Sequence, residues 1–148
     1  MPNKHNMKIA VAIVIPERTA PLSDVFGRSN YFLIYNTSDN SADILPNPFA
    51  KELGGAGIQS ARFLIENEAD VVIVKKIGIN PFRFFKSANI KVYQCKEGNA
   101  IEAIRLFTDG KLLPIENITE DFSFGRKRNR YGKKSMGEKY NNKKKGNI

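Results

Sequence analysis

The stretch GGAGIQSARFLIENEADVVIV, residues 54–74, predicts an α/β fold because its hydrophobic period changes partway along. Ile58, Ala61 and Leu64 recur at helical spacing and form one apolar stripe. Residues 71–74 follow as a short, wholly apolar run, which is typical of a strand buried on both faces. A helix that leads directly into a buried strand indicates a sheet whose later strands are parallel and joined by right-handed crossovers.

The flanking sequence supplies the other elements. Upstream, KIAVAIVI is apolar on both faces and predicts a central strand that Pro16 ends, and two further runs separated by polar turn residues predict a hairpin. Downstream, Pro81 fits the first turn of a second helix, and a last strand and helix follow. The predicted order is β-β-β-α-β-α-β-α in a mixed five-stranded sheet, with strands at 8–15, 31–37, 42–45, 71–74 and 91–94 and helices at 57–67, 81–88 and 99–107.

Composition divides the chain into a neutral body and a basic end. Residues 1–125 hold 14 basic and 14 acidic side chains, whereas residues 126–148 hold ten basic side chains against one acidic, a net charge of +9. Residues 126–148 contain too few apolar residues to form a core, so we expect a disordered tail. The predicted regions are an extension at 1–6, one domain at 7–114, a linker at 115–125 and the cationic tail at 126–148.

The tail predicts an anionic partner. The candidate contacts are Arg126, Lys127, Arg128, Arg130, Lys133, Lys134, Lys143, Lys144 and Lys145. Two tyrosines, Tyr131 and Tyr140, lie between these cations, and basic segments with interleaved aromatics also bind nucleic acids through phosphates and stacked bases. A multivalent tail can draw several chains onto one polyanion, so we expect self-assembly driven by the ligand.

Other features narrow the class of protein. No apolar run approaches the roughly 20 residues that a membrane span needs, and the first residues are polar, so we expect a cytoplasmic protein with no membrane partner. The single cysteine, Cys95, excludes an internal disulfide and a four-cysteine metal site within one chain. In that position it is more often a small buried hydrophobe than a ligand. The single histidine, His5, makes histidine-based catalysis and zinc binding improbable.

Three positions in the predicted domain favour an anion. Gly54, Gly55 and Gly57 precede a helix, where free N–H groups and the helix dipole attract negative charge; a tight turn explains the same glycines equally well. Arg28 offers a fork of donors for an anion, or it pairs with Asp24 or caps a loop carbonyl. Lys75 and Lys76 follow a buried strand, at the edge where ligands of open α/β sheets gather, although paired lysines are commonly just a solvated loop.

The chain resembles the dinitrogenase iron-molybdenum cofactor biosynthesis family over roughly residues 7–112. The resemblance is carried by MKIAVA at 7–12, FGRSNYFLIYNT at 26–37, GGAGIQSARFLIENEADVVIV at 54–74, IGINPF at 77–82 and IKVYQ at 90–94. The positions shared with the family are Phe26, Gly27, Arg28, Gly54, Gly55, Gly57, Ile58 and Gly78. The chain departs from the family pattern at Lys75 and Lys76 and in its tail, and each departure adds positive charge.

This resemblance implies a ribonuclease-H-like α/β fold and binding of iron-sulfur clusters or nitrogenase cofactor precursors. One cysteine cannot supply the thiolates of a discrete cluster, but anionic iron-sulfide species could be held by cations and backbone N–H groups. We therefore expect a non-catalytic scaffold or store for an anionic iron-sulfur species; molybdenum has no support in the residues. Nuclease activity is disfavoured, because the strand at 8–15 carries no carboxylate and Asp24, Glu66 and Asp70 fall at scattered places.

Overall fold

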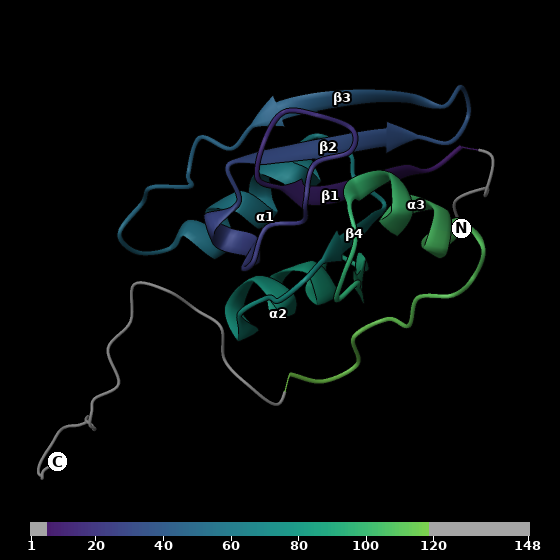
Figure 1. Ribbon diagram of the computed structural model, residues 1–148. Helices are drawn as coiled ribbons and strands as arrows, with labels where there is room; N and C mark the ends of the chain where they lie inside the picture. Colours follow the sequence, from purple (N-terminus) through teal and green to yellow (C-terminus); the bar gives the residue numbers. More distant parts are fainter. Residues whose placement is uncertain (1–5, 119–148) are drawn as a thin grey trace, which may run out of the picture.

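A five-stranded mixed sheet organises the chain (Figure 1). The computed structural model describes residues 6–118. The strands lie in the order β3-β2-β1-β4-β5, so β1 is central as predicted. The elements are β1 (Lys8–Ile13), the 3-10 turn η1 (Phe26–Arg28), β2 (Tyr31–Asn36), β3 (Ser41–Pro46), α1 (Ala56–Glu66), β4 (Val71–Val74), α2 (Ile79–Ser87), β5 (Lys91–Gln94) and α3 (Ala100–Thr108).

The strand directions match the prediction. β1 pairs antiparallel with β2, and β2 pairs antiparallel with β3, which makes the predicted hairpin. On the other side β1 pairs parallel with β4, and β4 pairs parallel with β5. The mixed sheet with parallel later strands is therefore confirmed. Because β2 alone runs in reverse, β1, β3, β4 and β5 all end at one edge, which we call the carboxyl edge.

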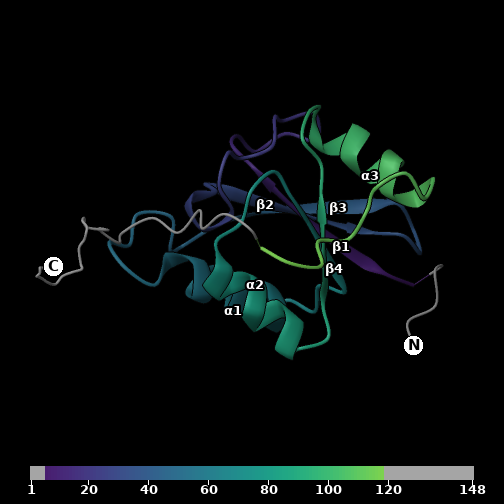
Figure 2. The same cartoon turned by 90° about the horizontal axis from the view of Figure 1, so that it is seen from below.

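Helices cover both faces of the sheet. Figure 2 shows α1 and α2 side by side on one face and α3 on the other. The first face buries Phe26, Phe32 and Phe85, whose rings lie 5.3 and 5.5 Å apart from centroid to centroid around Phe26. The second face buries alternate residues of β1, such as Val11, against α3. All but the first residue of β1 is buried, as a strand between two helical layers requires.

Two boundaries differ from the sequence prediction. β1 ends at Ile13 rather than Ile15, because the chain turns back there and Val14 N–H bonds to the carbonyl of Pro21. Beyond α3, Ile115 N–H donates to the carbonyl of Val92, and Ile115 and Ile118 pack on the core beneath α1 and α2. The folded body therefore continues at least to residue 118, into the segment predicted as a linker.

Candidate functional site

The carboxyl edge gathers four loops and three helix starts. The loops at 14–30, 47–55, 75–78 and 95–99 leave the strands there, and α1, α2 and α3 all begin there. They are tied together by backbone hydrogen bonds, such as Phe26 N–H to the carbonyl of Lys76 and Ala100 N–H to that of Ala20. Ligands of open α/β sheets bind outside this kind of edge. The sequence-predicted site residues of the body all lie on these loops or in the first turn of α1.

The first turns of α1 and α2 touch each other. A Cβ added to Gly57, in the first turn of α1, would lie 2.9 Å from Cγ of Pro81 in the first turn of α2. A Cβ added to Gly27 of η1 would lie 2.9 Å from the backbone of Gly57. These two glycines therefore serve close packing and not ligand approach. Their packing brings the positive ends of two helix dipoles together at the carboxyl edge.

The other two glycines of the loop face solvent. Gly55 is the N-cap of α1, with φ of +75°, and no side chain caps the helix there. A Cβ at Gly54 or Gly55 would meet nothing within 4 Å. The first helical bond of α1 runs from Gln59 N–H to the carbonyl of Gly55, so the preceding N–H groups have no helical acceptor. Gly57 therefore serves packing, whereas the space beside Gly54 and Gly55 is open, and an anion site there stays a prediction.

Arg28 holds the 47–55 loop in place. Its guanidinium donates hydrogen bonds to the carbonyls of Ala50, at 3.2 Å, and Glu52. Among the alternatives that the sequence left open, the loop-carbonyl role is the one that these bonds show. Asp24 instead pairs with Lys76, at 3.7 Å from Nζ to the carboxylate. Arg28 thus shapes the 47–55 loop that leads into the glycines.

The two lysines lie beside the α2 terminus. Lys75 and Lys76 are half-buried and follow β4, and the carbonyl of Lys75 accepts a hydrogen bond from the side chain of Gln94 at 3.1 Å. The pairing of Lys76 with the exposed Asp24 offsets part of its charge, although an exposed ion pair at this distance is weak. Both lysines therefore add positive potential to the place where α1 and α2 begin.

A buried polar network supports the edge and has no obvious signal in the sequence. The side-chain N–H₂ of Asn47 donates to the carbonyl of Ser29 and to the hydroxyl of Ser60, at 2.9 Å each. The hydroxyl of Ser29 lies 2.9 Å from that of Ser23 and 3.0 Å from the carbonyl of Ile13. Asn47 precedes Pro48, which predicts a turn but not these partners. The network fixes the start of the 47–55 loop against β1 and α1.

Cysteine coordination does not fit this edge. Cys95 is 3% exposed, and its Sγ donates to the carbonyl of Glu97 at 3.1 Å. Burial raises the pKa of the Cys95 thiol above its ordinary value of 9.0, so the metal-binding thiolate is disfavoured. Within residues 6–118 no group of three or more His, Cys, Asp or Glu side chains could hold a metal ion. Backbone N–H groups and lysines carry positive charge or potential, so this edge fits an anion better than a bare cation.

The carboxylates considered for phosphoryl chemistry lie apart. Asp24 is at the carboxyl edge beside Lys76, whereas Asp70 precedes β4 at the opposite edge and accepts a hydrogen bond from Lys8 N–H. Glu66 ends α1, again away from the carboxyl edge. These three side chains therefore do not form a two-metal site.

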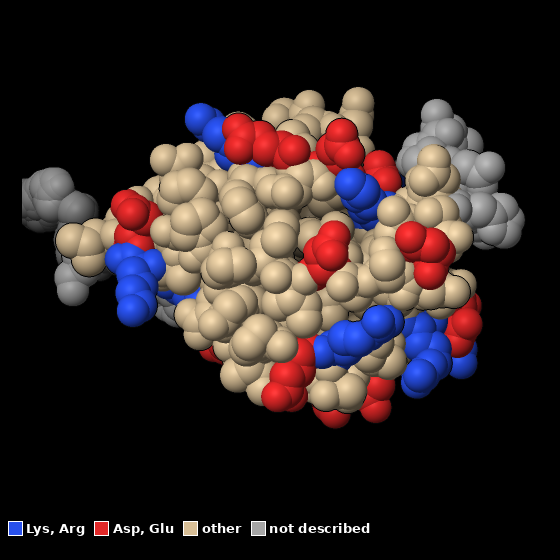
Figure 3. All heavy atoms as spheres, turned by 90° about the horizontal axis from the view of Figure 1, so that it is seen from above, with Lys and Arg blue, Asp and Glu red and all other residues tan. Residues whose placement is uncertain are grey.

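The body carries little net charge. Residues 6–118 hold 13 basic and 12 acidic side chains, a net charge of +1. Figure 3, which looks down from above, shows scattered blue and red groups on a mostly uncharged surface. Within the described part of the chain, no helix is long and apolar enough to cross a membrane. The predicted tail contacts, from Arg126 to Lys145, lie outside the described residues.

Comparison with known proteins agrees with the fold. The sequence profile of the dinitrogenase iron-molybdenum cofactor family matches residues 7–110. An uncharacterized protein of Methanocaldococcus jannaschii is 31% identical over 107 residues, which are 70% of this chain and 91% of that protein. A putative NifB protein from Thermotoga superimposes with a TM-score of 0.69 at 29% identity, over 77% of this chain and 97% of its own. The apo orange protein of Desulfovibrio gigas superimposes with a TM-score of 0.70 at 27% identity, over 77% of this chain and 100% of its own.

Proposed function

The chain belongs to the dinitrogenase iron-molybdenum cofactor family, and we propose that it is a non-catalytic scaffold or store for an anionic iron-sulfur species or metal cofactor precursor. Members of this family are associated with metal-cluster binding, and two helix N-termini and two lysines at the carboxyl edge support an anionic ligand. The proposal places the cargo at the start of α1, beside α2, with the cationic tail raising its local concentration. We expect the protein to act in the cytoplasm.

One observation carries the proposal: the N-termini of α1 and α2 pack together, and the glycines in front of α1 are exposed. The contact between Gly57 and Pro81 juxtaposes the two termini, and open space adjoins Gly54 and Gly55 in front of α1. Lys75 and Lys76 lie in the loop that leads into α2. A polyanion seated there meets backbone donors, two helix dipoles and two ammonium groups, and needs no thiolate.

The tail can reach this edge. Ile115 and Ile118 are packed on the α1 and α2 face, so the chain leaves the described body on that side. Eight further residues reach Arg126 and span at most about 29 Å when fully extended. A domain of this size has a radius of gyration of about 13 Å. The cations of the tail therefore lie within reach of an anion at the start of α1, and tails from several chains can share one large polyanion.

Iron and acid-labile sulfide measurements test the proposal. The full chain, a chain truncated after Gly125, and the body variant Lys75→Gln/Lys76→Gln are purified anaerobically and exposed to iron and sulfide. We expect co-eluting iron and sulfide that falls with truncation and falls further in the body variant. The control variant Lys86→Gln/Lys91→Gln, with the same loss of charge away from the carboxyl edge, should bind as the parent does. Equal retention in the body and control variants would move the site away from Lys75 and Lys76, and no retention in any chain would overturn the proposal.

Nucleic-acid binding is the second candidate, supported by the +9 charge of residues 126–148 beside a nearly neutral body. Binding of this kind releases counterions, so its affinity falls by orders of magnitude over a few-fold rise in salt. An anion seated on backbone donors loses less. A salt titration with a DNA or RNA oligomer, and separately with the iron-sulfide load, discriminates the two. If iron and sulfide stay bound at a salt concentration that releases the oligomer, the scaffold function is favoured over nucleic-acid binding.

A further inference from the structure

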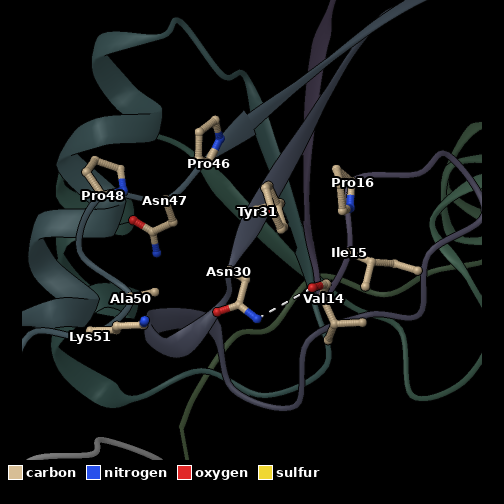
Figure 4. Close-up of a pocket in the computed structure, with 10 residues that line it drawn as sticks. All are labelled: Val14, Ile15, Pro16, Asn30, Tyr31, Pro46, Asn47, Pro48, Ala50 and Lys51. Atoms are coloured by element: carbon tan, nitrogen blue, oxygen red, sulfur yellow. Dashed lines mark hydrogen bonds between the residues drawn. The ribbon is translucent and has the colours of Figure 1, made fainter.

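A groove lies beside the candidate cargo site, on the far side of the 47–55 loop. Figure 4 shows it between the end of β1, the start of β2 and the segment that follows β3. It has a volume of about 580 Å³, within the range of small-molecule sites. Three prolines, Pro16, Pro46 and Pro48, and the ring of Tyr31 supply much of its apolar wall. The aromatic ring lies between Pro46 and Pro16, where a second flat group could contact it.

The polar end of the groove carries one cation. Lys51 lines it, and its side chain extends toward the amide of Asn30 (Figure 4). No ion pair or hydrogen bond of the Lys51 ammonium occurs within residues 6–118. The Nδ2 of Asn30 points away from Lys51, toward the carbonyl of Val14, to which it donates a long hydrogen bond of 3.5 Å (Figure 4). Lys51 is therefore the donor at this end of the groove, and no described protein group accepts a hydrogen bond from it.

The walls of this groove are held in place by contacts outside it. Arg28 binds the carbonyl of Ala50, and Asn47 is anchored to Ser29 and Ser60. The ring of Tyr31 packs on the core between the sheet and α3. A ligand would therefore order few protein groups beyond the Lys51 side chain, which lowers the entropic cost of binding.

We propose that this groove binds a small organic acid whose carboxylate is attached to a flat apolar group. The carboxylate meets the ammonium of Lys51, and the flat group lies against Tyr31 between the prolines. Charge complementarity selects the carboxylate, and the volume selects a small molecule. The inference goes beyond the proposed function, because the groove shares only the 47–55 loop with the cargo site and holds none of Gly54, Gly55, Lys75 or Lys76.

The test uses the full chain, labelled for NMR, with phenylacetate and its neutral analogue phenylacetamide as probes. We expect saturable shifts of the signals of Asn30, Tyr31 and Asn47, with the acid binding roughly fivefold more tightly than the amide, as one exposed charge pair provides. Lys51→Met should remove the difference between the probes, whereas Lys86→Met, an equal loss of charge on α2, should preserve it. Tyr31→Leu should weaken both probes.

The inference would be overturned by no saturable shift up to tens of millimolar probe, by shifts confined to residues 126–148, or by equal affinity of the acid and the amide for the parent chain. Equal effects of Lys51→Met and Lys86→Met would do the same. The cargo site is left intact in each variant, so iron and sulfide retention by Lys51→Met reports on the proposed function independently. A failure here leaves that measurement unaffected.

Discussion

Replacing Gly27 with alanine tests the packing that joins η1 to α1. The added Cβ would lie 2.9 Å from both Cα and N of Gly57, and these are backbone atoms that cannot rotate away. Overpacking of this kind costs about 1–3 kcal/mol, and the lower entropy of the unfolded alanine chain offsets about 0.4–1 kcal/mol. The expected net loss of unfolding free energy is therefore about 1–2 kcal/mol. For a body of this size that corresponds to a fall in Tm of roughly 4–8 °C.

Urea and thermal unfolding, followed by circular dichroism, measure this loss. Gly54→Ala is the matched control, because its Cβ would meet nothing within 4 Å and its φ lies outside the left-handed region. That variant should be as stable as the parent or slightly more stable. The Gly27 variant should also show chemical-shift changes at the start of α1. If the two variants unfold at the same urea concentration, the close approach of η1 and α1 is wrong.

Two further predictions concern Arg28 and Cys95. Arg28→Met should speed amide exchange across residues 50–55, because it removes both hydrogen bonds that Nη1 donates to the carbonyls of Ala50 and Glu52. Arg28→Lys should rescue part of this effect, because one ammonium also has donors for two carbonyls. Exchange like the parent's in Arg28→Met would remove its role as a loop anchor. Cys95 should react with a thiol reagent at pH 7.5 at least roughly tenfold more slowly in the native chain than in urea. Burial raises the pKa of the Cys95 thiol in the folded state, so the folded chain holds this proton more tightly than the unfolded chain does. The free energy of unfolding should therefore fall as the pH rises above about 9, and Cys95→Ala should remove this pH dependence.

The architecture follows from local patterns. Apolar runs, helical stripes and turn residues are properties of neighbouring positions, so β4 and β5 were predicted with their observed bounds and the helices to within two residues. Parallel pairing followed because a helix between two strands forces a crossover. The predicted end of β1 was wrong, because the strand ends where the chain turns back and pairs with Pro21 and Leu22, several residues later.

The roles of individual residues were harder to predict, because they depend on contacts between distant segments. Gly54, Gly55 and Gly57 look alike in sequence, and only the approach of Pro81 separates the packing glycine from the open ones. The sequence alone allows Arg28 to bind an anion, and only the structure shows that the 47–55 loop lies beside it and accepts its hydrogen bond. The network of Asn47, Ser29 and Ser60 joins three elements and has no local pattern at all.

The free energy that helix N-termini contribute to anion binding explains why the proposed function would need both the body and the tail. A helix terminus contributes about 0.3–1 kcal/mol toward an anion, and up to about 2 kcal/mol when partly buried. The two termini joined by Gly57 and Pro81 therefore supply at most about 4 kcal/mol, which corresponds to a dissociation constant near millimolar. A nearly neutral body cannot raise this by long-range attraction, whereas a tail with a net charge of +9 can. It follows that truncation after Gly125 should lower capacity and association rate, while Lys75→Gln/Lys76→Gln should weaken the seat itself and lower retention further.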